Sequence, residues 1–589
     1  MVNQDLLKRR ELLSMAQKAT FAIPAGSVFA SAVYAGGAQG PLDRAELPTF
    51  NVLAFGATGD GKTKETASIQ KAIDACSYAR GGTVYFPPGT YLAGTLQLRS
   101  NVMLNLSTSA IIQGTSVLSD WNPRHLIYAR DAVNIGISGH GKIDGAGPAF
   151  WRPKPKEDLA LGLTEGRRGF GWRMQGGRIA AFWWQALPRP GSMVRFENCK
   201  NVYISDILLE NAPAWTVHPV GCDSVFIRGI TIRNPLHGPN TDGIDIDGCS
   251  NVMIADCNIF TGDDAICLKN TDPLGVARVC RNITVTNCLI CTTCNAFKID
   301  EQFRSRKGHE NITFSNSIIY NDPAPDEDRA ASGVHLETND GGEVAGIVVS
   351  NIAMQNVRSP IFLRLGNRGR NGPRGVRTVG GPERKDAGRV WDKPGRLRDV
   401  LIENVFATGQ TVTNNITGLP GFDIENVSLR NISIRSTERG TSEWAARVVP
   451  EMPEEYGEMC MYGRLPAYGF YFRHVNGLRL NGVEVATDGV DMRPAVVCDD
   501  VKNLDIEGLS AMTPGGGQPV IRLIDVDRGL IRGCSSPPGA QTFVRVEGER
   551  SRRIALVGND LTESARAVER AANAAGDAVG EAGNLVAKA

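Results

Sequence analysis

Short runs of alternating apolar and polar residues recur along most of the chain, and a turn-forming residue precedes each run. Alternation with a period of two predicts β-strands that bury one face. The clearest copies of this unit begin at Asn134, Asn201, Ser224, Asn251, Asn282, Asn311, Gly346, Asp399, Asn426, Gly477 and Asn503. Between Asn201 and Asn311, successive copies are 23, 27, 31 and 29 residues apart.

This spacing predicts a solenoid, because repetition at about 20 to 50 residues is typical of stacked structural repeats. With three short strands in each repeat, the predicted fold class is all-β: a single-domain right-handed parallel β-helix over residues 41–560. Its coils would lie ~4.8 Å apart. A β-sandwich would lack the fixed phase of the turns, and a leucine-rich repeat would need Leu at fixed positions where this chain has other residues.

The two ends of the predicted β-helix differ in pattern. Residues 65–79 have helical periodicity, and a helix there would cover the open edge of the first coil. Its apolar face would consist of Ile69, Ala72, Ile73 and Cys76. Residues 561–589 are rich in Ala without large apolar anchors, which predicts a loose helix or disorder.

Residues 1–40 have the pattern of a targeting segment and linker. Paired arginines, Arg9 and Arg10, precede a moderately apolar run from Phe21 to Tyr34, which is similar to a bacterial twin-arginine signal. Such a signal predicts a periplasmic or secreted protein, and a basic surface helix is the alternative. No later stretch reaches the ~18 uninterrupted apolar residues of a membrane span, so none is expected.

Three segments longer than one coil interrupt the repeats, at residues 154–187, 366–398 and 437–466. Long loops on a rigid scaffold often carry binding sites, although disordered surface insertions are the alternative. The second of these segments holds ten Lys and Arg residues against three Asp and Glu.

Charge and cysteine content exclude several classes of protein. The 64 Lys and Arg residues balance 63 Asp and Glu, so no general attraction to nucleic acid or to an acidic membrane is expected. Cys199, Cys222 and Cys249 occur at one phase of the repeat, which favours small residues stacked in a core over disulfides. Cys291 and Cys294 form a lone CxxC with no second pair, which argues against a zinc site. We therefore expect neither a metal nor a cofactor.

Candidate chemistry lies in two stretches one coil apart. Asp263 and Asp264 follow Asp242 by 21 and 22 residues, so the three acids would stack on neighbouring coils. Glycoside hydrolysis needs one carboxylic acid and one carboxylate, and a separation of ~6.5 to 9.5 Å leaves room for the water of an inverting reaction. Crowding should raise the pKa of one of them. The alternative is that these Asp residues only form turns.

Strand alternation predicts further polar side chains on the same outer face. These substrate-binding candidates are Lys269, Lys298, His335, Glu337 and Arg364. They could hold sugar hydroxyls or a carboxylate, or could simply form a solvated sheet face. Trp215 and His218 would lie one coil before the acids.

Several motifs together resemble glycoside hydrolase family 28, the polygalacturonase and rhamnogalacturonase family. They are Phe50-Asn51-Val52 with Phe55-Gly56-Ala57, Val84-Tyr85-Phe86-Pro87-Pro88-Gly89, Gly141-Lys142-Ile143-Asp144-Gly145, Asn240-Thr241-Asp242-Gly243 and Gly262-Asp263-Asp264. The resemblance runs from about residue 50 past residue 365 and implies a right-handed β-helix and an inverting reaction. It further implies that Asp263 is the general acid, that Asp242 and Asp264 activate water, and that Asn240 contacts substrate.

Two departures from the family pattern limit this inference. Thr293-Cys294-Asn295 stands where the family usually has Gly-His-Gly, and His335-Leu336-Glu337 stands where it has Arg-Ile-Lys, which grips uronate. We therefore predict a monomeric, end-acting inverting glycoside hydrolase whose partner is a pectic or other acidic plant or algal carbohydrate. The alternatives are a non-catalytic glycan-binding protein and a polysaccharide lyase.

Overall fold

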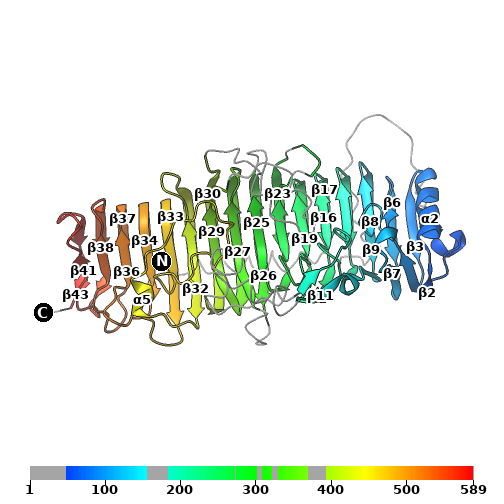
Figure 1. Ribbon diagram of the computed structural model, residues 1–589. Helices are drawn as coiled ribbons and strands as arrows, with labels where there is room; N and C mark the ends of the chain where they lie inside the picture. The colour runs from blue at the N-terminus through cyan, green and yellow to red at the C-terminus, as the bar shows by residue number, and fades with distance from the viewer. Residues whose placement is uncertain are drawn as a thin grey trace, which may run out of the picture. The chain divides into compact units, whose positions relative to one another are not determined.

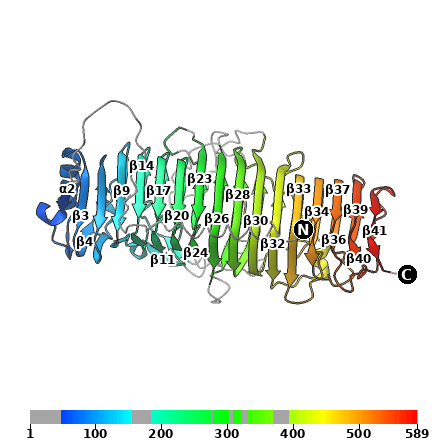
Figure 2. The ribbon, with the colours of Figure 1, turned by 180° about the vertical axis from the view of Figure 1, so that it is seen from behind.

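The structure is a computed structural model that describes residues 48–154, 184–271, 273–276, 278–301, 308–321, 329–368 and 393–587. They belong to one compact unit, Leu47–Ala589. Within it, strands of successive coils pair side by side in parallel (Figures 1 and 2). The predicted fold class, a right-handed parallel β-helix, is confirmed. The predicted targeting segment, residues 1–40, lies outside the described residues.

Each coil adds strands to three columns, and most strands pair with their counterparts one coil before and one coil after. The first column consists of β5 (Leu96–Gln97), β8 (Ile127–Arg130), β13 (Val194–Glu197), β16 (Val217–Val220), β19 (Ile244–Asp247), β22 (Ile266–Lys269), β25 (Asn295–Glu301), β27 (Ala330–Thr338), β29 (Val357–Leu365), β31 (Asn414–Thr417), β33 (Phe470–Thr487), β34 (Val496–Glu507), β36 (Ile521–Ile524), β38 (Val544–Glu547) and β41 (Val568–Arg570). The second consists of β1 (Thr49–Asn51), β3 (Gly82–Phe86), β6 (Val102–Leu106), β9 (Val133–Gly139), β14 (Lys200–Ser205), β17 (Asp223–Arg228), β20 (Ser250–Ala255), β23 (Cys280–Thr286), β26 (His309–Tyr320), β28 (Glu343–Gln355), β30 (Arg396–Gln410), β32 (Ile424–Ser436), parts of β33 and β34, β37 (Asp527–Arg532), β39 (Arg552–Val557) and β42 (Val579–Ala582).

The third column is shorter, because from β26 onward single long strands bend through two columns. It begins with β2 (Asp60–Lys64), β4 (Gly89–Ala93), β7 (Ala110–Gly114), β10 (Lys142–Asp144), β15 (Leu208–Glu210), β18 (Thr231–Arg233), β21 (Asn258–Thr261) and β24 (Leu289–Thr292), and later holds β35 (Ser510–Ala511). Smaller pairs are antiparallel β11 (Trp151–Pro153) with β12 (Trp184–Ala186), and parallel β40 (Asp560–Leu561) with β43 (Leu585–Val586). Short 3₁₀ helices occur at Val52–Phe55, Leu118–Asp120 and Gly147–Phe150.

The turns and the core follow the sequence pattern. Asn251, Asn282 and Asn311 adopt φ values of 55° to 58°, a left-handed conformation that Asn tolerates better than most residues. The side-chain amide of Asn282 donates to that of Asn251 at 2.9 Å, and the amide of Asn311 donates to that of Asn282 at 2.8 Å. Apolar side chains of alternate strand positions fill the interior.

The cysteine prediction is confirmed, because Cys199, Cys222 and Cys249 are buried and stacked. The backbone N–H of Cys199 lies 3.4 Å from the Cys222 sulfur, and that of Cys222 lies 3.3 Å from the Cys249 sulfur.

The N-terminal end is covered as predicted, whereas the prediction for the C-terminal tail is wrong. Helix α2 (Thr66–Tyr78) buries the predicted face of Ile69, Ala72, Ile73 and Cys76 over the first coil. At the other end the predicted tail, 561–589, continues the β-helix through β41 and β42. Backbone pairing with the preceding coil and small buried residues such as Ala578 are sufficient there, so large apolar anchors are not required.

The predicted insertions are described to different extents. Most of 154–187 and of 366–398 lies outside the described residues. Residues 437–466 are fully described and include helix α5 (Ser442–Ala445), and we call residues 449–457 the strap. A search of the described residues finds no helix both long and apolar enough to cross a membrane.

Candidate active site

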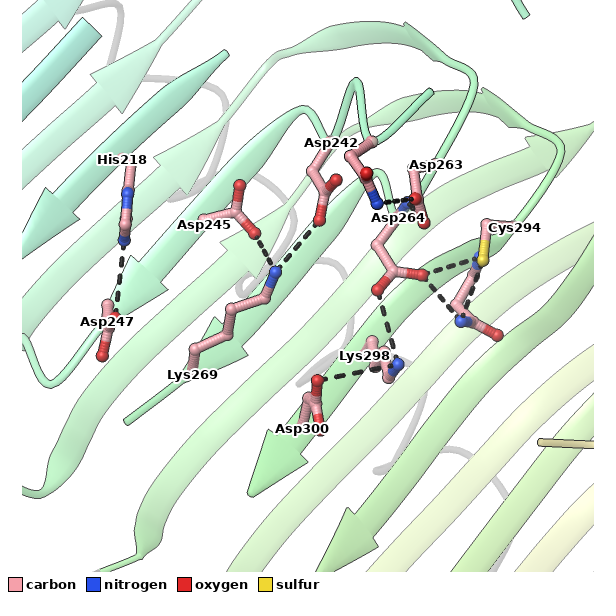
Figure 3. A network of polar contacts seen from close by, with 12 residues as sticks. His218, Asp242, Asp245, Asp247, Asp263, Asp264, Lys269, Cys294, Lys298 and Asp300 are labelled. Carbon is pink, nitrogen blue, oxygen red and sulfur yellow. Dashed lines mark hydrogen bonds and ion pairs between the residues drawn. The ribbon is translucent and has the colours of Figure 1, made fainter. Parts of the chain in front are cut away.

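Asp242, Asp263 and Asp264 lie together where two neighbouring coils enter the first column (Figure 3). The N–H of Gly243 donates to the Asp264 carbonyl at 2.9 Å, which places Asp242 beside Asp264 on adjacent coils. The Asp263 carbonyl accepts the hydroxyls of Thr261 and Thr292, which fixes its backbone. The three predicted acids are therefore brought together.

The Asn240 side chain contacts Asp263, which is itself bonded to the backbone of Asp264. Its Nδ2 donates to Asp263 Oδ2 at 3.1 Å, and the N–H of Asp264 donates to Asp263 Oδ1 at 2.9 Å. Asn240 is itself solvent-exposed and has a left-handed backbone (φ 55°). A polar group that is both exposed and bonded to an acid is well placed to meet a substrate.

Lys269 is buried under Asp242. Its Nζ lies 3.0 Å from Asp242 Oδ2 and 2.6 Å from Asp245 Oδ1, and 3.8 Å from the centre of the Trp215 ring. Trp215 and His218 therefore lie one coil before the acids, as predicted. Lys269 serves as a counter-ion for two carboxylates rather than as a free cation.

Lys298 has the same role one coil later. Its Nζ lies 3.5 Å from Asp264 Oδ2, 3.5 Å from Glu337 Oε1 and 3.8 Å from Asp300 Oδ2. It also donates to the Tyr456 hydroxyl at 2.6 Å, and that hydroxyl donates to Asp300 Oδ2 at 2.9 Å. Lys298 is 3% exposed, so these contacts operate in a largely dehydrated setting.

The pKa values of the acids are driven in opposite directions by this arrangement. Burial, followed by the neighbouring Asp264, raises the pKa of Asp263. Burial would also raise the pKa of Asp264, but Lys298 and Lys269 outweigh it and hold that pKa below its usual value. Burial raises the pKa of Asp242 well above its usual range and that of Asp245 to about 7. One protonated and one ionised carboxyl in contact suit acid–base chemistry.

Asn295 and His335 support Asp264 from the next coils. Asn295 Nδ2 donates to Asp264 Oδ1 at 2.7 Å, and Asn295 Oδ1 accepts from His335 Nδ1 at 3.1 Å. His335 is fully buried and its Nε2 lies 3.5 Å from Glu337 Oε2. The predicted substrate contact of His335 is therefore replaced by an indirect link to Asp264.

Cys294 closes one side of the acid pair. Its sulfur and one carboxylate oxygen each from Asp263 and Asp264 lie within 4.8 Å of one another. Burial raises the pKa of the Cys294 thiol well above its usual value, which favours the neutral thiol.

The strap covers the part of the face that the sequence predicts to be open. Arg364 Nη2 donates to the carbonyls of Glu451 and Met452 at 3.1 Å and 2.9 Å, and Arg473 donates to those of Val449 and Pro450, both at 2.7 Å. The predictions that Glu337 and Arg364 face solvent or substrate are thus wrong, because both are fully buried beneath the strap.

The approach of the strap to this face is very close. A Cβ atom added to Gly457 would collide with Glu337 Oε2, so a larger residue there would require the Glu337 carboxylate to move.

Arg189 is a site residue that the sequence analysis missed. Its guanidinium donates to the carbonyls of Pro213 and Pro239 and, through Nη2, to Asn240 Oδ1 at 3.1 Å. Nearby, Trp184 stacks on His237 with ring centres 4.4 Å apart. The available signal was the Pro-Arg-Pro tripeptide directly after the first insertion, since two prolines hold one side chain in a stiff backbone.

Comparisons with known proteins agree with this geometry. Residues 76–366 match the model of glycosyl hydrolases family 28. A probable polygalacturonase of Vitis vinifera is 25% identical over 415 residues, covering 65% of this chain and 74% of that protein. An exo-poly-alpha-D-galacturonosidase of Dickeya chrysanthemi is 25% identical over 424 residues, covering 64% and 65%. A family 28 exopolygalacturonase structure from Yersinia enterocolitica superimposes with a TM-score of 0.54 at 19% identity, covering 79% of each chain.

Buried acids stacked on one face of a parallel β-helix, together with these relatives, define a glycoside hydrolase. Residues 76–366 match glycosyl hydrolase family 28, which supports membership of the chain in that family. The β-helix itself continues well beyond that region, to β42 and β43.

Proposed function

We propose that this protein hydrolyses a glycosidic bond of a pectic or other acidic plant or algal carbohydrate, with inversion and from a chain end. The observation that carries the proposal is the pairing of Asp263 with Asp264, whose pKa values are shifted up and down respectively, beside Asp242 on the next coil. Several relatives are named polygalacturonases, which supports the choice of pectic substrates.

In the proposed reaction Asp263, kept protonated by burial and by its anionic neighbour, donates a proton to the leaving oxygen. Asp264 remains ionised because of Lys298 and deprotonates the attacking water, which Asp242 helps to orient. The new C–O bond forms as the glycosidic bond breaks, and the water proton passes to a carboxylate.

End action is supported by the strap. It covers the first column immediately beyond Lys298, where an open groove would have to continue for a long polymer to pass. Residues 1–40 would direct the protein to the periplasm or outside the cell, and the protein would act as a monomer.

The test is digestion of a panel of pectic and other acidic oligosaccharides, with the anomer of the product followed by NMR. Asp263→Asn should lower the turnover by at least ~100-fold, the lower range for removing a general acid. Asp256→Asn is a matched control, because Asp256 is also a turn Asp but lies away from the site, paired with Arg228. Binding without cleavage by the wild-type protein would favour a non-catalytic glycan-binding protein, and an unsaturated product would favour a lyase.

A further inference from the structure

Arg189 is placed to control the general acid without touching it. Its guanidinium joins two turns, since Nη1 donates to the Pro213 carbonyl at 2.7 Å and also to the carbonyl of Pro239, the residue before Asn240. The flanking backbone is fixed as well, because the N–H of Leu187 donates to Phe150 and that of Gly191 donates to Arg124. The guanidinium is therefore held in place independently of any substrate.

Arg189 also decides which way the Asn240 amide points. Nη2 can only donate, so the amide atom facing it must be the oxygen, Oδ1, at 3.1 Å. The amide nitrogen then faces Asp263, to whose Oδ2 it donates at 3.1 Å. A flipped amide would place two donors against each other and an oxygen against a carboxylate.

We propose that Arg189 is a positioning residue for the general acid, acting through the Asn240 amide that holds the Asp263 carboxyl. The proposal rests on the proposed function, in which Asp263 is the acid. Arg189 is only partly exposed and remains cationic at neutral pH, because burial lowers its pKa only to about 10.

The charge of Arg189 adds an electrostatic effect to the positioning effect. Among the described residues, the charged and titratable groups that face Asp263 are Arg189, Asp242, Asp264, Lys269 and Cys294. Removing a cation from this set favours the protonated form of Asp263. Activity that requires the protonated acid should then persist to higher pH.

The experiment measures kcat and KM against pH for Arg189→Met, Arg189→Lys and Asn240→Ala, and for the double variant. Arg189→Met should lower kcat ~10- to 100-fold, as expected for a misplaced catalytic group. It should also move the alkaline limb of the pH profile of kcat/KM to higher pH. Arg189→Lys should keep the limb near its wild-type position, because it keeps the charge. In the Asn240→Ala background, Arg189→Met should cause little further loss of kcat, because both changes break the same link.

Arg233→Met is the matched control, because that arginine lies on another column, is largely exposed and pairs with Glu210. A rise in KM with unchanged kcat and an unmoved limb would overturn the proposal and assign Arg189 to substrate binding. Fully multiplicative losses in the double variant would also overturn it. Wild-type protein that cleaves no glycan would refute the proposed function instead, so the two failures are distinguishable.

Discussion

Replacing Lys298 by Met is expected to change the pH dependence of the enzyme through Asp264. Lys298 Nζ lies 3.5 Å from Asp264 Oδ2, and both groups are buried. In the wild-type protein this cation is the main influence that holds the pKa of Asp264 below its usual value. Asp264 thus stays ionised as the pH falls, and the acid limb of the pH–rate profile lies at low pH.

The size of the effect follows from the geometry. Two unit charges 3.5 Å apart interact by about 5 kcal/mol at an effective dielectric constant of ~20. Even a third of this energy exceeds the ~1.4 kcal/mol that moves a pKa by one unit. Without Lys298, the Asp264 carboxyl should therefore protonate at a pH at least about one unit higher. The acid limb of the pH–rate profile should move to higher pH by the same amount.

The assay is the pH profile of kcat/KM for Lys298→Met and Lys298→Arg on the best substrate of the panel. Lys298→Arg keeps the charge and should keep the limb near its wild-type position. Lys502→Met is a matched control, since Lys502 is partly exposed and pairs with Asp423 away from the site. A folded Lys298→Met protein with the wild-type acid limb would refute the assignment of Asp264 as the ionised base.

Two further predictions concern stability and the thiols. Arg364→Met should lower the free energy of unfolding, measured by urea denaturation, by ~2 to 4 kcal/mol, because the buried carbonyl of Gly418 and the partly buried carbonyls of Glu451 and Met452 lose their donor. An unchanged unfolding midpoint, like that expected for Arg430→Met at an exposed position, would contradict this. In Ellman titration, the native protein should react at about one thiol or fewer, while the unfolded protein should give all 13 without reductant. Fewer than 13 would reveal disulfides.

The strands and the stacking of the acids were predictable because they depend on local pattern. Asn282 marks a turn through its own backbone preference, and Ile283 and Val285 mark the interior by alternation. The spacing of Asp242 and Asp264 then matches one coil. Lys269 and Lys298 were likewise placed on the correct face.

The contacts of the strap could not be predicted from the sequence, because the strap has no periodic pattern. Tyr456 reaches Lys298 across 158 residues of sequence, and nothing in the local pattern around either residue indicates this contact. Arg364 was consequently assigned to the substrate when it binds the strap. The tail was misjudged because strand pairing at the end of a stack needs only small side chains such as Ala578.

The coil-by-coil construction of the β-helix also constrains how such a chain can change in evolution. Strand pairing joins each coil only to the coils on either side, so coils can be gained or lost beyond β34, after the strap, without moving the acids. A coil inserted between β19 and β22 would instead move Lys269 ~4.8 Å further from Asp242 and leave both charges buried alone. The number of coils can therefore vary at the C-terminal end of this protein, while the interval between Asp242 and Lys298 is constrained by the ion pairs between neighbouring coils.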